Sequence, residues 1–176
     1  ARDNVQLGLH RDMPAETYHA IPAMSAGGLK RMRQSPAHFY GLQLDPHRPG
    51  SEPTPAMRNG TLVHCALFEP ETVAERYVVK PAEVDFRTKD GKAWRDAQTR
   101  EIVEDVQMRT ALAQAAAVRA LPDVSALMAE GYAESSAFWL DDDTGELCKC
   151  RPDWVSPAGD GVILVDGKTC QDASPE

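Results

Sequence analysis

A short apolar run between two polar stretches most constrains how this chain of 176 residues folds. Residues 162–165 read Val-Ile-Leu-Val and follow Gly159-Asp-Gly161, a pattern typical of a β-strand that begins after a turn. A strand with a period of two places Asp166 and Lys168 on one face at its C-terminal end. A carboxylate beside an ammonium favours a metal ligand next to a cation that activates water. The alternative is a surface ion pair at a strand end.

Further acids lie on predicted neighbouring strands. Residues 147–155 alternate in the same way, and Asp153 lies near the end of their polar face. Residues 132–140 form the other arm of this hairpin, so antiparallel pairing brings Glu134 near the level of Asp153. If the strand before Asp166 pairs beside them, Asp153 and Asp166 come within reach of one Mg²⁺ or Mn²⁺ ion. Glu134 is then either an extra acid of the site or an exposed strand carboxylate.

The segment Arg58–Phe68 has the apolar spacing of a helix, and Pro70 follows its end. Gly60 and His64 lie one helical turn apart and share a face. A glycine there allows a close approach to a sheet where the imidazole projects. His64 is therefore a candidate metal ligand, and the alternative is a packed, hydrogen-bonded histidine.

The predicted order of elements is helices first and sheet afterwards. Residues 14–130 are mainly helical, including one long alanine-rich helix over 92–121, and residues 131–170 form the sheet. The predicted class is α/β, of the α+β type, with a mixed central sheet flanked by helices. The length suits one domain over residues 1–176 with a sizeable core.

Charge is unevenly distributed along the chain. Its 19 Lys and Arg residues against 27 Asp and Glu residues give a net charge of −8, which by itself argues against nucleic-acid binding. However, a helix predicted to begin after Ser25 as N-cap carries a local basic face made of Lys30, Arg31 and Arg33. This face suits phosphate, or is an ordinary solvated helix face.

The four cysteines, Cys65, Cys148, Cys150 and Cys170, do not have the spacing of a zinc site. They are predicted to be reduced, structural thiols. A cysteine-bound cluster is the minor alternative, and with it a redox or metal-sensing protein built on Cys148 and Cys150. No apolar run reaches the roughly 18 residues of a membrane span, so no membrane association and a cytoplasmic location are expected.

Six short segments together resemble a known family. The order of His64, Asp153 and Asp166-x-Lys168 is similar to the RecB-like branch of the PD-(D/E)xK nucleases. The flanking segments narrow the resemblance to the exonuclease VIII (RecE) family and its phage relatives, and they are Tyr18-His-Ala-Ile-Pro-Ala-Met-Ser-Ala-Gly-Gly-Leu-Lys30, Ser35-Pro-Ala-His-Phe-Tyr40, Gly60-Thr-Leu-Val-His64, Leu67-Phe-Glu-Pro70, Cys150-Arg-Pro-Asp153 and Asp166-Gly-Lys-Thr169.

The resemblance implies a restriction-endonuclease-like core and a Mg²⁺- or Mn²⁺-dependent exodeoxyribonuclease. Such an enzyme degrades one strand of duplex DNA from its end, 5′ to 3′, in recombination. It implies that Asp153 and Asp166 hold the metal with the backbone carbonyl of Gly167. It further implies that His64 is an additional ligand or orients one, and that Lys168 positions or activates the attacking water.

The resemblance also makes four residues the candidates for contacts with DNA phosphates: Ser35, Arg33, Arg31 and Arg58. The implied partners are double-stranded DNA ends, a single-strand annealing protein and further copies of the chain in a ring-shaped homo-oligomer. The implied source is a bacterial or phage genome, and the implied location is the cytoplasm.

The sequence departs from the family pattern in two places. The middle residue of Asp-x-Lys is usually bulky in the family, whereas Gly167 has no side chain to pack behind the metal. The chain also ends at Glu176, before a helix with a glutamine and a tyrosine that follows in the family. The expectation is thus a C-terminally incomplete nuclease domain, and the alternative function is a catalytically impaired or truncated module that binds DNA ends.

Overall fold

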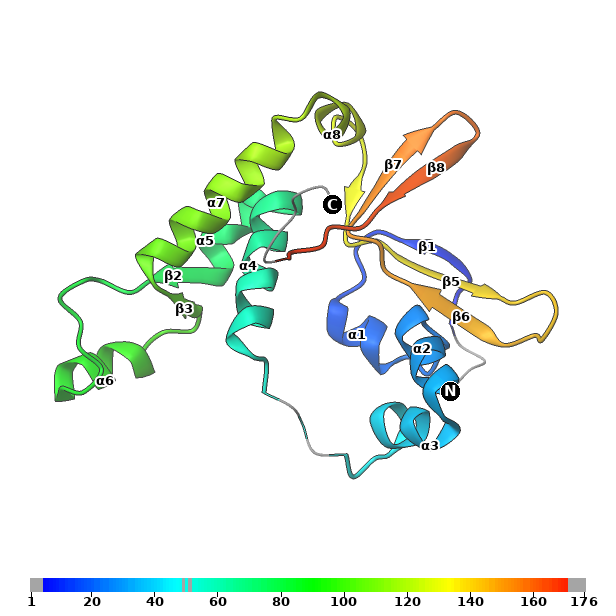
Figure 1. The fold of residues 1–176 in the computed structure, drawn as a ribbon, viewed down its shortest axis with the longest axis horizontal. Coiled ribbons are helices and arrows are strands. Elements are labelled where there is room, and N and C mark those ends of the chain that lie inside the picture. Colours follow the sequence, from blue (N-terminus) through cyan, green and yellow to red (C-terminus); the bar gives the residue numbers. More distant parts are fainter. Residues whose placement is uncertain (1–4, 49, 51, 171–176) are drawn as a thin grey trace. The chain divides into compact units, whose positions relative to one another are not determined.

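The computed structural model describes residues 5–48, 50 and 52–170, which form two compact units. The sheet unit comprises the described residues of Ala1–Glu52 and Gly131–Asp166. The helical unit comprises Pro53–Glu130 and the described part of Gly167–Glu176. The predicted α+β class is confirmed (Figure 1). Residues 171–176, in which the sequence offers no replacement for a further helix, lie outside the described residues.

The strands of the sheet unit form two antiparallel three-stranded sheets. One has the order β1-β5-β6, with β1 at Gly8–His10, β5 at Ser136–Leu140 and β6 at Leu147–Cys150. The other has the order β4-β7-β8, with β4 at Tyr132–Ala133, β7 at Trp154–Ala158 and β8 at Gly161–Val165. Strands therefore gather in small sheets rather than in one central sheet (Figure 1).

Short helices make up the rest of the sheet unit: α1 at Ala15–Ala20, α2 at Ala26–Gln34, α3 at Pro36–Phe39 and a π-helical turn at Tyr40–Leu44. The Ser25 hydroxyl accepts a hydrogen bond from the Gly28 N–H at 3.2 Å, which confirms the predicted N-cap of α2. The next helix has Ser35 as its N-cap and Pro36 in its first turn, where proline loses no helical hydrogen bond.

A buried lysine ties α1 to the sheet. Tyr18, Phe138 and Leu147 form a buried apolar cluster in the sheet unit. The side chain of Lys149 reaches its edge, and its Nζ donates to the carbonyls of Tyr18 at 2.9 Å and of Ile21 at 2.6 Å. Burial lowers the pKa of Lys149, but these carbonyls compensate for the water that the ammonium loses.

The helical unit packs α4 (Pro55–Phe68) against α7 (Asp105–Arg119) (Figure 1). The Arg119 side chain closes this pair, since its Nε donates to the Leu67 carbonyl at 2.7 Å. No helix among the described residues is both long and apolar enough to pass through a bilayer. The remaining elements are a 3₁₀ turn at Pro70–Thr72, α5 at Val73–Arg76, β2 at Tyr77–Val79, α6 at Lys89–Asp96, β3 at Glu101–Val103 and α8 at Pro122–Leu127.

The single long helix predicted over 92–121 is wrong. Its first part belongs to α6 and its last to α7, and β3 lies between them and pairs in parallel with β2. The β-branched pair Ile102-Val103 favours the strand. A capping box of Glu104 and Gln107 then starts a new helix.

The predicted strands over 132–140 and 147–155 are each interrupted. β4 ends at Ala133 before β5 begins at Ser136, and β6 ends at Cys150 before β7 begins at Trp154. The strand over 162–165 is confirmed within β8. It ends before Asp166, so the prediction that Asp166 and Lys168 share a strand face is wrong.

Tyr77 makes the stability of the helical unit depend on pH. Its side chain is 4% exposed, and burial, followed by the nearby Cys65 and Glu101, raises the pKa of Tyr77 to about 12. The unfolded chain loses this proton near pH 10, so the contribution is complete below pH 10 and is lost as the pH rises to about 12. We expect the free energy of unfolding, measured in urea, to fall more steeply across this range in the wild type than in Tyr77→Phe. Parallel curves would contradict this assignment.

Candidate metal centre

Two strand interruptions face each other in the sheet unit. Glu134 lies in the interruption between β4 and β5, and Asp153 lies in the interruption between β6 and β7. The Glu134 N–H donates to the Asp153 carbonyl at 3.1 Å, which fixes the two segments side by side. Glu134 has a φ of 51° and is the one non-glycine residue with a positive φ in the part of the chain described. Pro152, with no N–H to donate, prevents a continuous ladder on the other side.

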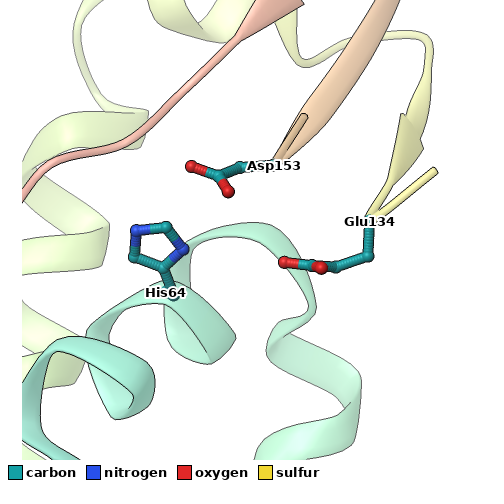
Figure 2. A group of neighbouring side chains, drawn as sticks. All are labelled: His64, Glu134 and Asp153. Atoms are coloured by element: carbon teal, nitrogen blue, oxygen red, sulfur yellow. The ribbon is translucent and has the colours of Figure 1, made fainter. Parts of the chain in front are cut away.

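These interruptions bring two carboxylates together. A carboxylate oxygen of Glu134 lies within 4.8 Å of one of Asp153 (Figure 2). Asp153 is 9% exposed and Glu134 is half-buried, so both charges are partly removed from water. The Arg151 Nε donates to Glu134 Oε2 at 2.8 Å and balances one of the charges. The prediction that Glu134 lies near the level of Asp153 is confirmed.

Asp166 follows the last pair of the β7–β8 ladder. That pair is Trp154 and Val165, so the next residue on each strand is Asp153 on one and Asp166 on the other. Asp166 is exposed and, among the residues described, does not join the group of potential ligands that contains Glu134 and Asp153. The register thus makes the two predicted acids the next residues at adjacent strand ends, whereas Glu134 is the acid with a carboxylate oxygen within 4.8 Å of one of Asp153.

In the helical unit, His64 contacts the backbone that follows these strands. It projects from α4 (Figure 2). Its Nε2 donates to the Gly167 carbonyl at 2.7 Å. A Cβ added to Gly60, one turn earlier, would lie 3.4 Å from the Thr169 hydroxyl, so a glycine permits this close approach of the chain to α4. The Lys168 side chain is exposed, and its Nζ lies 3.5 Å from the same Gly167 carbonyl. A histidine nitrogen, a lysine ammonium and a carbonyl oxygen therefore lie together.

The predicted phosphate-binding residues lie in different settings. Arg31 is half-buried, donates to the Gln43 side chain and lines a cavity of about 760 Å³ in the sheet unit. Arg33 and Arg58 are exposed, and the Arg58 Nε lies 3.4 Å from the Pro53 carbonyl. The Ser35 hydroxyl accepts from the His38 N–H at 3.1 Å and contacts the His38 ring. It therefore has a structural role as a cap.

The four cysteines are free thiols. Cys148 and Cys150 lie on the same side of β6, opposite the buried Leu147 and Lys149. Burial raises the pKa of both thiols, which favours the protonated form over the thiolate that binds metals.

Two features were not predicted from the sequence. One is the guanidinium of Arg151, which joins Glu134 to its surroundings. The other is Ser135, whose hydroxyl is fully buried and has no hydrogen-bond partner among the residues described. The sequence marks neither of them, since the partners of Arg151 lie in segments that meet it only in the fold.

Acids at paired strand ends, followed by Gly-Lys in an α+β fold, are the features of a PD-(D/E)xK-type domain. Residues 25–176 match the family described as PDDEXK-like domain of unknown function (DUF3799), and the chain belongs to this family. The match supports the predicted superfamily and a nuclease activity. No curated protein matches the chain.

We expect Asp153 to be required for stabilisation by metal. An ion that binds only the folded chain raises its stability by about 2.7 kcal/mol at a concentration of 100 times the Kd. Mn²⁺ should therefore raise the unfolding temperature of the wild type, and Asp153→Asn should lose most of that rise. The matched control is Asp160→Asn, in the exposed β7–β8 turn, which should keep it. An undiminished rise in Asp153→Asn would contradict the assignment.

Proposed function

We propose that the chain is a metal-dependent nuclease that hydrolyses phosphodiester bonds of DNA. The finer proposal is a RecE-like exodeoxyribonuclease that degrades one strand of duplex DNA from its end, 5′ to 3′, in recombination. The family match supports the nuclease class. The short sequence segments shared with the RecE family support the exonuclease activity.

The observation that carries the proposal is the register of β7 and β8. Pairing of Trp154 with Val165 makes Asp153 and Asp166 the next residues on adjacent strands, although 13 positions separate them in the sequence. Carboxylates near one another repel unless a cation or a proton lies between them. An arrangement of this kind, with Glu134 close to Asp153, suits a hard divalent cation with oxygen ligands.

The backbone connects the proposed metal ligand Asp166 to the group that His64 contacts. Asp166 is joined by a peptide bond to Gly167, whose carbonyl is the group that His64 contacts at 2.7 Å. A metal held by Asp166 and the Gly167 carbonyl would therefore have the imidazole as a neighbour. The donors are carboxylates and a carbonyl, with the imidazole hydrogen-bonded to that carbonyl, and they fit Mg²⁺ or Mn²⁺ rather than a thiolate-bound metal.

Divalent metal ions, when bound, supply a hydroxide-like nucleophile and neutralise charge on the phosphate oxygens. Asp153 and Asp166 would fix the position of the reacting phosphate by holding that charge. The Lys168 ammonium, which lies beside the Gly167 carbonyl, would hold the attacking water and the phosphate oxygen in line. His64 would keep the Gly167 carbonyl oriented.

DNA would be held by cations outside the metal centre. Arg31 and Arg33 on α2, and Arg58 on α4, are the proposed phosphate contacts, with the Ser35 hydroxyl as a further one. Arg31 is the best placed of these because it lines a cavity while remaining half-buried. A ring-shaped oligomer and a single-strand annealing protein as partner are part of the RecE-like proposal and rest on the sequence resemblance alone.

The proposal is tested by digestion of linear, 5′-phosphorylated duplex DNA with Mg²⁺, with EDTA and against a closed circular duplex. Loss of linear DNA that requires Mg²⁺ and spares the circle supports an end-dependent nuclease. Loss of both substrates supports the nuclease and overturns the exonuclease. No loss, with binding of DNA ends retained, favours the alternative of an impaired or truncated end-binding module.

Lys168→Ala identifies the active site within the same assay. Removing a group that positions the water and the phosphate should reduce the cleavage rate by about 100-fold or more, as general acid–base and electrostatic groups typically contribute. Binding of the duplex, measured by fluorescence anisotropy in Ca²⁺, should change little. The control is Lys92→Ala, on the exposed surface of α6. Unchanged cleavage in Lys168→Ala would remove Lys168 from the active site.

A further inference from the structure

We propose that Arg151 is a positioning residue that makes Glu134 a ligand of the metal held by Asp153. This inference rests on the proposed function and names a ligand and its support that the family motif does not include. Glu134 and Asp153 belong to the same unit, and their carboxylate oxygens lie within 4.8 Å of each other. One ion with ligand distances of about 2.0–2.6 Å can bridge oxygens at that separation.

The contacts of Arg151 leave one oxygen of Glu134 for a cation. The Arg151 Nε donates to Oε2 of Glu134 at 2.8 Å, so Oε1 is the oxygen that can face an ion. The other end of the guanidinium is anchored, because NH1 donates to the Met13 carbonyl at 2.9 Å and to the Ser136 hydroxyl at 2.6 Å. The arginine side chain is 14% exposed. The Arg151 side chain therefore connects the chain near α1 to the Glu134 carboxylate and holds that carboxylate in place.

The backbone conformation at Glu134 also indicates that its carboxylate is held in a fixed position. A positive φ is costly for a residue with a side chain, at roughly 1–3 kcal/mol, and persists only where surrounding contacts impose it. Here the N–H is tied to the Asp153 carbonyl and the carboxylate is tied to Arg151. Glycine would adopt this backbone without strain, whereas glutamate is held in it by these two contacts, which also fix the position of its carboxylate.

The charge of Arg151 makes the proposal testable against a simpler account. A guanidinium near a metal repels it, so a purely electrostatic role predicts tighter metal binding when the charge is removed. A positioning role predicts weaker binding, because carboxylate ligands depend on hydrogen bonds from outside the ligand set and lose about 10–100-fold in affinity without them.

The experiment is a titration of the whole chain with Mn²⁺, in which the electron paramagnetic resonance of the free ion reports binding. Arg151→Gln and Glu134→Gln should each weaken Mn²⁺ binding by about 10-fold or more. The double variant should be no weaker than Glu134→Gln alone, because Arg151 acts through Glu134. The matched control is Arg87→Gln, which removes an arginine–carboxylate contact of the helical unit, with Asp85, and should bind Mn²⁺ as the wild type does.

Circular dichroism and the unfolding temperature establish that each variant is folded. If Arg151→Gln does not fold, Arg151→Lys keeps the cation but loses the planar fork, and the same loss of affinity is expected. Unchanged or tighter binding in the folded arginine variants, or in Glu134→Gln, would overturn the positioning role while metal-dependent cleavage by the wild type still stands. A wild-type chain that neither binds Mn²⁺ nor cleaves DNA would overturn both this inference and the proposed function.

Discussion

The hydrogen bond from the Glu134 N–H to the Asp153 carbonyl is the contact on which the rest of the sheet unit depends. It joins the two points at which the chain leaves one small sheet and enters the other. At Glu134 the chain passes from β4, in the sheet β4-β7-β8, to β5, in the sheet β1-β5-β6. At Asp153 it passes back, from β6 in the sheet β1-β5-β6 to β7 in the sheet β4-β7-β8. Because neither segment can continue its ladder there, both carry acidic side chains to the place where the sheets meet.

The carboxylates of Glu134 and Asp153 bear on both the stability of the fold and the proposed metal site. Glu134 has an arginine within 2.8 Å, and the pair is only partly exposed, as is common for ion pairs that stabilise a fold. Asp153 is 9% exposed, and one of its carboxylate oxygens lies within 4.8 Å of one of Glu134. A divalent cation bound to both carboxylates would stabilise them side by side in this partly desolvated place. Within the helical unit, His64 and Lys168 both lie near the Gly167 carbonyl.

Much of this arrangement was predictable because local patterns fixed it. The run Val162–Val165 has few alternatives to a strand, and Ser25 and Pro36 mark helix starts by their own chemistry. That Glu134 lies beside Asp153 followed from the antiparallel pairing of the predicted hairpin. The interruptions were missed, because the alternation around Pro152 outweighed the signal of a residue with no N–H to donate, and it gives no sign that the chain passes to another sheet. The break between α6 and α7 was missed for a similar reason, since pairing of β3 with the distant β2 decides it rather than local helix propensity.

The role of Arg151 was not predictable, because its value depends on three segments that meet only in the fold. Met13, Glu134 and Ser136 each offer it an acceptor, and none of them is marked in the sequence as its partner. The Gly167 carbonyl was expected as a metal ligand from the resemblance, but its contacts with His64 and Lys168 were not predicted.

The central claim is that the acids at these strand ends hold one divalent cation for hydrolysis of DNA. Anomalous diffraction at the manganese edge, from crystals of the chain grown with Mn²⁺, tests it most directly. The account predicts an anomalous peak within about 2.0–2.6 Å of carboxylate oxygens of Asp153 and Glu134. Full occupancy by Mn²⁺ elsewhere, with no peak beside Asp153, would contradict it.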